Sequence, residues 1–166
     1  MQVTQHIITW PVSLEVFKAH LRMKSSEFDS DLQLKLNAAT RAAEMEIADI
    51  LAKRENVATT AFSSVVNLPE EPIEVISVEI DGVLIDIDKY TVVGSAVRLD
   101  SSVSGSEIII TYHTGLKDPD KVDDDIKAAI LLIASSFWRN PVDSVEQLPK
   151  ASQNLLKFHR KWPKNI

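Results

Sequence analysis

The sequence predicts an α+β fold, with a helical core made by an N-terminal helix pair and by C-terminal helices, and a small antiparallel β-sheet inserted between them. Apolar residues recur with the period of a helix in residues 13–56 and 120–162, and with the period of a strand in residues 57–116. Gly and Pro turn signals separate the short strand patterns. We therefore expect a single domain over residues 1–166, with its helical core at 13–56 and 120–162 and its β insertion at about 57–116.

The composition is that of a globular protein and excludes several kinds of chemistry. The chain has 166 residues, of which 45% are hydrophobic and 25% are charged, so it can bury a core. It has no Cys, which excludes disulfides, thiolate metal sites and Cys nucleophiles. Only 4 Gly argue against a Gly-rich phosphate loop, and a net charge of -6 argues against general binding of nucleic acid.

No segment has the pattern of a signal peptide or a membrane span. The longest apolar run, residues 128–134, is far shorter than the roughly 20 residues that a membrane helix needs. Residues 1–10 lack a cationic stretch followed by an apolar one. We expect no membrane partner and a cytoplasmic setting.

The N-terminal part predicts an extended arm and a short helix. Residues 1–12 are mostly strand formers, and Pro11 biases Trp10 away from helix. Ser13 is a candidate N-cap, with Glu15 close to the positive helix end. Apolar residues then follow at helical spacing to about Met23.

A longer helix is predicted from Asp29 or Ser30 to about Arg54. Its apolar stripe is wider than the narrow seam of a coiled coil, so we expect neighbours on more than one side. The stripe consists of Leu32, Leu36, Ala39, Ala43, Ile47 and Ile50, widened by Leu34, Ala38 and Met45.

Strand patterns fill the middle of the chain. Period two begins at about Ala58, and Ile76, Val78 and Ile80 are expected on one face. Asp81-Gly82 predicts a type I′ hairpin turn, because both central residues of that turn have positive φ. The strands are expected at about 58–66, 76–80, 83–87, 90–93, 96–99 and 107–112, in a small antiparallel sheet or partial barrel.

Helices resume after a turn at 118–120. One of Asp123 to Asp125 is expected to cap a helix that runs to about Asn140, where Pro141 ends it. One helical turn is predicted at 145–148, and a final helix at 151–161 after Pro149.

The sequence predicts no catalytic residue, no metal site and no cofactor-binding residue. None of the four His has a metal-ligand spacing partner, and no G-x-S-x-G motif accompanies a Ser. The densest acidic cluster, Asp118, Asp120, Asp123, Asp124 and Asp125, does not match a calcium loop. Capping of the helix that follows explains it better than a cation site does.

The strongest candidate for binding lies at the carboxyl end, which is basic and carries a Trp. Either these cations complement a helix dipole, or they contact nucleic acid, an acidic protein surface or a partner subunit. At the end of the preceding helix, Trp138 lies off the apolar stripe. The candidate subunit or partner interface is Trp138, Arg139, Phe158, His159, Arg160, Lys161 and Trp162.

Ordered local motifs resemble the head-tail connector (adaptor) proteins of tailed bacteriophages and prophages, in the members that carry a β insertion. W-P-V-S-L-E-V-F-K-A-H-L-R at 10–22 is similar to the family's P-V-S-L-E-E-V-K-x-H-L-R start. The acidic D-S-D at 29–31 and the Y-H-T-G at 112–115 also resemble family features, the latter a Y-x-x-G strand end. The segments at 125–140 and 148–160 resemble its I-K-x-A-I-L-L-L-x-A-x-x-Y-x-N-R helix and its P-x-x-V-x-x-L-L-x-P-Y-R close. Phe137-Trp138 and Phe158-His159 depart from these patterns.

The resemblance implies a structural virion protein without enzymatic activity or cofactor. Such proteins form a ring of about a dozen copies below the portal, complete the DNA-filled head and dock neck or tail components. The implied partners are further copies of the chain, the portal protein and a downstream neck or tail-completion protein. DNA passes through the lumen without specific binding, since an acidic ring repels phosphates. The implied location is the head-tail junction of the virion, after assembly in the host bacterial cytoplasm.

Two other functions compete with this one. A nucleic-acid-binding DNA-packaging factor would use the basic C-terminus. A metal-dependent hydrolase would use the acidic cluster at 118–125.

Overall fold

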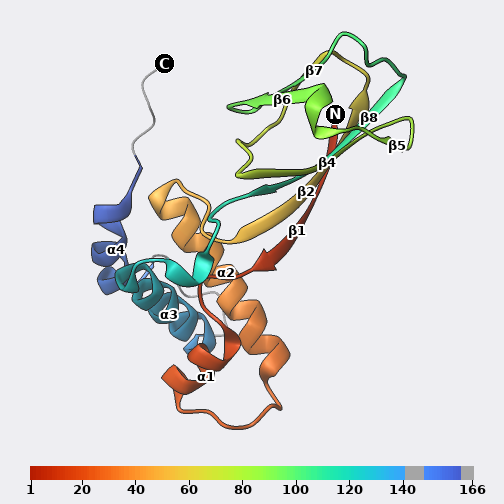
Figure 1. Cartoon of the computed structure of the whole chain (residues 1–166). Helices are drawn as coiled ribbons and strands as arrows, with labels where there is room; N and C mark the ends of the chain where they lie inside the picture. Colours follow the sequence, from red (N-terminus) through yellow and green to blue (C-terminus); the bar gives the residue numbers. More distant parts are fainter. Residues whose placement is uncertain (141–147, 162–166) are drawn as a thin grey trace. The chain divides into compact units, whose positions relative to one another are not determined.

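A computed structural model describes residues 1–140 and 148–161 (Figure 1). The chain divides into two compact units. The sheet unit comprises Met1–Ile8 and Lys53–Lys117, and the helical unit comprises Thr9–Ala52 and the described residues from Asp118 onward. Four α-helices and two antiparallel sheets in the described residues confirm the predicted α+β class. That the whole chain is one connector domain stays a prediction.

The sheet unit contains a five-stranded sheet in the order β1-β2-β8-β4-β5. Its strands are β1 Gln2–Thr9, β2 Lys53–Ala61, β8 Glu107–Thr114, β4 Glu74–Ile80 and β5 Val83–Leu84. The central strand β8 pairs antiparallel with β2 and with β4. β1, predicted as an extended arm, is therefore an edge strand beside β2.

A second, three-stranded sheet has the order β3-β7-β6. Its strands are β3 Val65–Asn67, β7 Ala96–Leu99 and β6 Tyr90–Val93, and the 3₁₀ turn η1 Ile87–Lys89 precedes β6. One apolar cluster draws on both sheets: Ala58, Val66, Leu68, Val78, Ile80, Val97, Leu99, Ile108, Ile110 and Tyr112. Alternation along each short strand directs these side chains inward.

The turns of the sheet unit agree with the sequence more closely than the strand limits do. Asp81 and Gly82 have φ of 50° and 79°, which confirms the predicted turn. The strand predicted from about Ala58 to Val66 is divided in two, because β2 ends at Ala61 and β3 begins at Val65, and the Ser63 hydroxyl donates to the Val65 carbonyl in the connecting turn. The return strand after the turn is also shorter than expected, with η1 beginning at Ile87.

Ile76 does not share a face with Val78 and Ile80, contrary to the prediction. The pairing of β4 with β8 shifts register between Val75 and Ser77. The irregularity reverses the side-chain alternation at this point. Ile76 is therefore 47% exposed, whereas Val78 is buried.

The helical unit is built from both ends of the chain, as predicted. Its helices are α1 Leu14–Leu21, α2 Asp29–Ile47, α3 Asp124–Arg139 and α4 Lys150–Leu156, with 3₁₀ turns η2 Pro119–Lys121 and η3 Lys157–His159. α3 packs against α2 and α4, and α1 packs against α2. The buried side chains include Phe17, Leu32, Leu36, Ile47, Ile130, Ile133 and Leu156.

The long helix ends seven residues before its predicted limit at Arg54. Ala48 takes the left-handed conformation at φ 55° and closes α2. The Glu44 carboxylate then accepts the N–H groups of Leu51 at 2.9 Å and Ala52 at 3.0 Å. Residues from Lys53 onward pair with β8 as β2 instead, so the strand also begins earlier than the predicted Ala58.

The helix caps follow the sequence at one end of the chain more closely than at the other. Ser13 Oγ accepts the Val16 N–H at 3.3 Å, which confirms Ser13 as the N-cap of α1. Asp123 occupies the N-cap position of α3, but its side chain makes no capping hydrogen bond.

The predicted stop at Pro141 and most of the predicted turn at 145–148 lie outside the described residues. The final helix is shorter than expected, because it tightens to η3 at Lys157. None of the described helices has the length and apolar character needed to cross a bilayer.

Candidate functional site

The carboxyl end of α4 exposes a large aromatic side chain. Phe158 lies in η3 and is 86% exposed, whereas Leu156, two residues earlier, is fully buried. Two positions rotate the side chain by roughly 200° in an α-helix and roughly 240° in a 3₁₀ turn, so Phe158 points away from the buried side that Leu156 occupies. An exposed aromatic side chain of this size is a typical interface residue.

The basic residues that follow Phe158 are paired with carboxylates of the helical unit. His159 Nδ1 lies 3.5 Å from Asp123 Oδ2 and, when protonated, forms an ion pair there. Arg160 donates from Nε to the Glu46 carbonyl at 3.0 Å and from Nη2 to the Glu46 carboxylate at 3.2 Å. These contacts hold the end of the described chain against α2 and the start of α3.

Lys161 makes two further contacts to the C-terminal end of α2. Its Nζ lies 2.7 Å from Asp49 Oδ2, and its backbone N–H donates to the Ile47 carbonyl at 2.8 Å. The basic run therefore neutralises local carboxylates. Arg160 and Lys161 are 49% and 65% exposed, yet each already faces a carboxylate of its own chain.

The remaining predicted interface residues form a separate group. Trp138 is half-buried and packs edge-to-face on Phe28, with ring centroids 5.6 Å apart. Arg139 beside it is exposed. His159 contacts the first turn of α3 and Trp138 lies in its last turn, about 20 Å along the helix, so the structure does not bring the two groups together. Trp162 lies outside the described residues.

The acidic cluster before α3 is engaged in ion pairs. Lys121 Nζ donates to Asp118 at 3.1 Å, and this hydrogen bond together with the negative charge of Asp118 raises the pKa of the Lys121 amine above its ordinary value. Lys127 Nζ lies 3.9 Å from Asp124. In residues 1–140 and 148–161, no three His, Asp or Glu side chains are grouped as metal ligands. The cluster pairs with nearby cations, whereas the predicted side-chain cap of the following helix is not formed.

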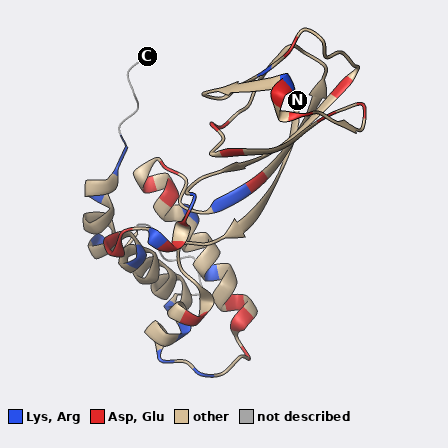
Figure 2. Ribbon diagram, viewed as in Figure 1, with Lys and Arg blue, Asp and Glu red and all other residues tan. Residues whose placement is uncertain are grey.

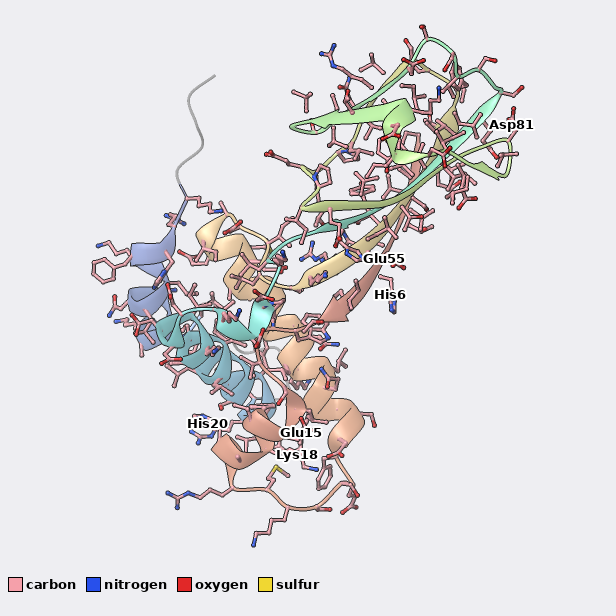
Figure 3. All side chains as sticks on the ribbon, viewed as in Figure 1. His6, Glu15, Lys18, His20, Glu55 and Asp81 are labelled. Atoms are coloured by element: carbon pink, nitrogen blue, oxygen red, sulfur yellow. The ribbon has the colours of Figure 1, made fainter. Side chains whose placement is uncertain are left out.

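A groove of about 490 Å³ lies beside α1, lined by Leu14, Lys18, Met23 and Asp29 among others. Figure 3 shows Glu15 and Lys18 on α1 at this place. Lys18 Nζ donates to Asp29 Oδ1 at 2.6 Å. Lys18 and Asp29 thus pair with each other in the lining of the groove.

Sequence reasoning did not single out a second exposed surface, on α2. Leu34 is 62% exposed and Met45 is 83% exposed, with Ala38 and Arg41 exposed between them. Their spacing places all four on one side of the helix, here called the outer α2 face. Leu34, Ala38 and Met45 are the residues that widen the apolar stripe, from which neighbours on more than one side were expected. Within the described part of the chain, no element covers this face.

The negative charge is concentrated in the sheet unit. Its sequence holds ten acidic and five basic residues, whereas the helical unit holds fourteen and thirteen. Figure 2 shows Asp and Glu along the strands and loops of the sheet unit, with few Lys or Arg. The sheet unit therefore carries most of the net negative charge of the chain.

The comparisons with known proteins identify the fold. No family model matches the sequence, and no curated protein matches it. A solved structure of the neck of a native gene transfer agent particle, computed with C12 symmetry, contains a similar chain with a TM-score of 0.65 and 17% identity, covering 98% of this chain and 96% of that chain. The neck of an empty particle, computed with C6 symmetry, contains a chain with a TM-score of 0.63 and 17% identity, covering 96% of both. The virion of the native particle contains one with a TM-score of 0.64 and 18% identity, covering 98% and 96%. The chain thus shares, over nearly its whole length, the fold of proteins in the neck and virion of gene transfer agent particles, in agreement with the resemblance to head-tail connectors.

Proposed function

We propose that the protein is a head-tail connector of a tailed phage or prophage, a ring of about a dozen copies below the portal that completes the DNA-filled head and docks neck or tail components. The observation that carries the proposal is the fold shared with chains of a particle neck, over 96–98% of this chain. The match includes both units, so it does not rest on a common motif alone. The role is structural, and the location is the head-tail junction.

The helical unit offers the two kinds of surface that a ring needs. A cyclic assembly uses a heterologous contact, in which one surface of each subunit meets a different surface of the next. Phe158 and the outer α2 face are both exposed and apolar, and they lie on different elements. We place Phe158 of one copy between Leu34 and Met45 of the next, over the small side chain of Ala38. Arg41 then lies beside the aromatic ring, where a cation–π contact is favourable.

The paired state of the C-terminal cations favours this function over a DNA-packaging factor. A DNA-binding surface needs cations that can exchange counterions for phosphates. His159, Arg160 and Lys161 instead meet Asp123, Glu46 and Asp49 in their own chain. DNA in the lumen is then repelled rather than bound.

Reconstitution with the portal tests the function. Purified protein is mixed with portal rings encoded by the same genome, and the complexes are analysed by light scattering and negative-stain imaging. We expect a closed ring on one end of the portal. Failure to bind the portal, together with salt-sensitive binding of duplex DNA by the isolated chain, would support the packaging factor instead.

Cysteine cross-linking tests the subunit contact separately. The chain has no native Cys, so Ala38→Cys and Phe158→Cys proteins can be mixed and oxidised without background. We expect a disulfide between the two variants in assembled rings. A mixture of Phe158→Cys with Thr91→Cys, an exposed position in the sheet unit, is the matched control. Rings that form without the 38–158 disulfide would refute this contact and leave the connector function intact.

A further inference from the structure

The sheet unit has one long edge strand among short ones. In the described residues the four sheet edges are β1, β5, β3 and β6. β5 has two residues, β3 has three and β6 has four, whereas β1 has eight. Short edges offer few unpaired N–H and C=O groups, so β1 presents the longest open hydrogen-bonding edge of the described residues.

β1 lacks the features by which proteins protect such edges. Lys, Pro, inward charges and very short strands normally block pairing with another chain. The strand reads Q-V-T-Q-H-I-I-T, with no Pro and no Lys, Arg, Asp or Glu. All of its residues except Ile7 are exposed, among them Val3 at 37% and Ile8 at 44%. Figure 3 shows His6 projecting from this strand.

The side of β1 that faces β2 is held by hydrogen bonds, so β1 is an ordered strand with which another segment can pair. Gln5 Nε2 donates to Asn56 Oδ1 on β2 at 2.9 Å. The buried Asn56 side chain in turn donates to Thr114 Oγ1 on β8 at 2.9 Å. This polar chain ties three strands together, and an incoming segment would not have to order β1 first.

We propose that the outer edge of β1 docks an extended segment of a different neck protein, which adds to the sheet as a further strand beside β1. The inference rests on the proposed function. Backbone hydrogen bonds would supply most of the affinity. Because β1 contains no Lys, Arg, Asp or Glu, the segment it fits is uncharged, rich in β-branched residues and about eight residues long.

A second copy of this chain fits the edge less well. Pairing of β1 with β1 of another copy is two-fold and closed, so it uses the edge without continuing a ring. The other edges of the described chain are half the length of β1 or shorter. A strand from a different protein can pair with the backbone groups along the whole length of β1, and it leaves the ring contact in the helical unit available.

Hydrogen exchange tests the docking directly. Amide exchange of residues 2–9 is measured by mass spectrometry in the free protein and in necks purified from particles of the same phage or prophage. We expect exchange of the outward-facing amides, about half of the strand, to slow at least tenfold in the neck. Equal exchange in both states would overturn the inference.

Cross-linking identifies the occupant. Thr4→Cys labelled with a benzophenone is incorporated into necks and irradiated, with Thr91→Cys on the exposed edge strand β6 as the matched control. An adduct with a different neck protein, specific to position 4, supports the proposal. An adduct with the mass of two copies of this chain overturns it.

A charged variant completes the test and separates it from the proposed function. Thr4→Lys blocks strand addition and should reduce incorporation into necks at least tenfold, whereas Thr91→Lys should not. Thermal unfolding of both variants verifies that the sheet unit is folded. Normal incorporation of Thr4→Lys would refute the docking and leave the connector function standing. Absence of the wild-type chain from necks would refute both.

Discussion

In each unit, one carboxylate accepts hydrogen bonds from two successive backbone N–H groups, but the carboxylate is buried in the helical unit and exposed in the sheet unit. In the helical unit, the Glu44 carboxylate accepts the N–H groups of Leu51 and Ala52, and Glu44 is 7% exposed. In the sheet unit, the exposed Asp81 carboxylate accepts the N–H groups of Ser106 and Glu107 at 2.9–3.1 Å. Each carboxylate has two backbone N–H donors, and the access of water to the two sites differs.

The comparison shows that burial sets the energy of such a contact. A buried N–H that loses its acceptor keeps its full desolvation cost, roughly 1–3 kcal/mol. An exposed N–H exchanges its carboxylate for water at little cost. The same two hydrogen bonds should therefore stabilise the helical unit more than the sheet unit.

Glu44→Ala should have the largest effect. Two buried N–H groups lose their acceptor, so we expect the free energy of unfolding to fall by about 3 kcal/mol. Glu44→Gln keeps an acceptor oxygen and should lose less than half of that. Urea unfolding followed by circular dichroism measures both. An alanine variant as stable as the wild type would show that Leu51 and Ala52 find other acceptors.

Asp81→Ala should have a smaller effect in the sheet unit. Water replaces the carboxylate at both N–H groups, but alanine is strained at the φ of 50°. We expect a loss of about 1–1.5 kcal/mol, and a smaller loss for Asp81→Asn, because Asn tolerates this conformation. Asp86→Ala, a nearby exposed carboxylate, is the control and should be neutral. A cost equal to that of Glu44→Ala would contradict the role of burial.

Local chemistry made much of the fold predictable, and long-range contacts explain the errors. The Asp81-Gly82 turn and the strands at 90–93 and 96–99 follow from turn residues and period two. The end of α2 at Ile47 does not, since the next residues include good helix formers. What ends the helix is the pairing of β2 with β8, more than fifty residues later in the sequence.

The sequence shows which residues make up the candidate interface, but not which of them are exposed or paired with other side chains. Its basic residues stand out in the sequence, yet the Glu46 partner of Arg160 lies 114 positions earlier. Phe158 is exposed because it lies two positions after the buried Leu156, and only the packing of α4 against α3 shows which side of the helix is buried. The long edge β1 was predicted as an extended arm, and only the sheet order shows that one side of it is open.

The smallest effect is expected at high pH, from the buried ionisable side chain in the core of the sheet unit. Tyr112 is 1% exposed; burial first, and the negative charge of Glu70 second, raise the pKa of its phenol above the ordinary value of 10.0. The folded state thus favours the protonated phenol. Its contribution to stability is complete below pH 10.0 and is lost as the pH rises from there through the folded-state pKa.

Tyr112→Phe removes this titration while it keeps the ring in the core. We expect wild type and variant to differ little at pH 8, and the wild type to lose more stability than the variant between pH 9 and pH 11. Urea unfolding of both proteins across that range gives the difference, in which the titration of Lys side chains common to both cancels. Parallel stability curves would mean that the phenol ionises equally well in the folded chain, and that the sheet core admits water where the helical unit, around Glu44, does not.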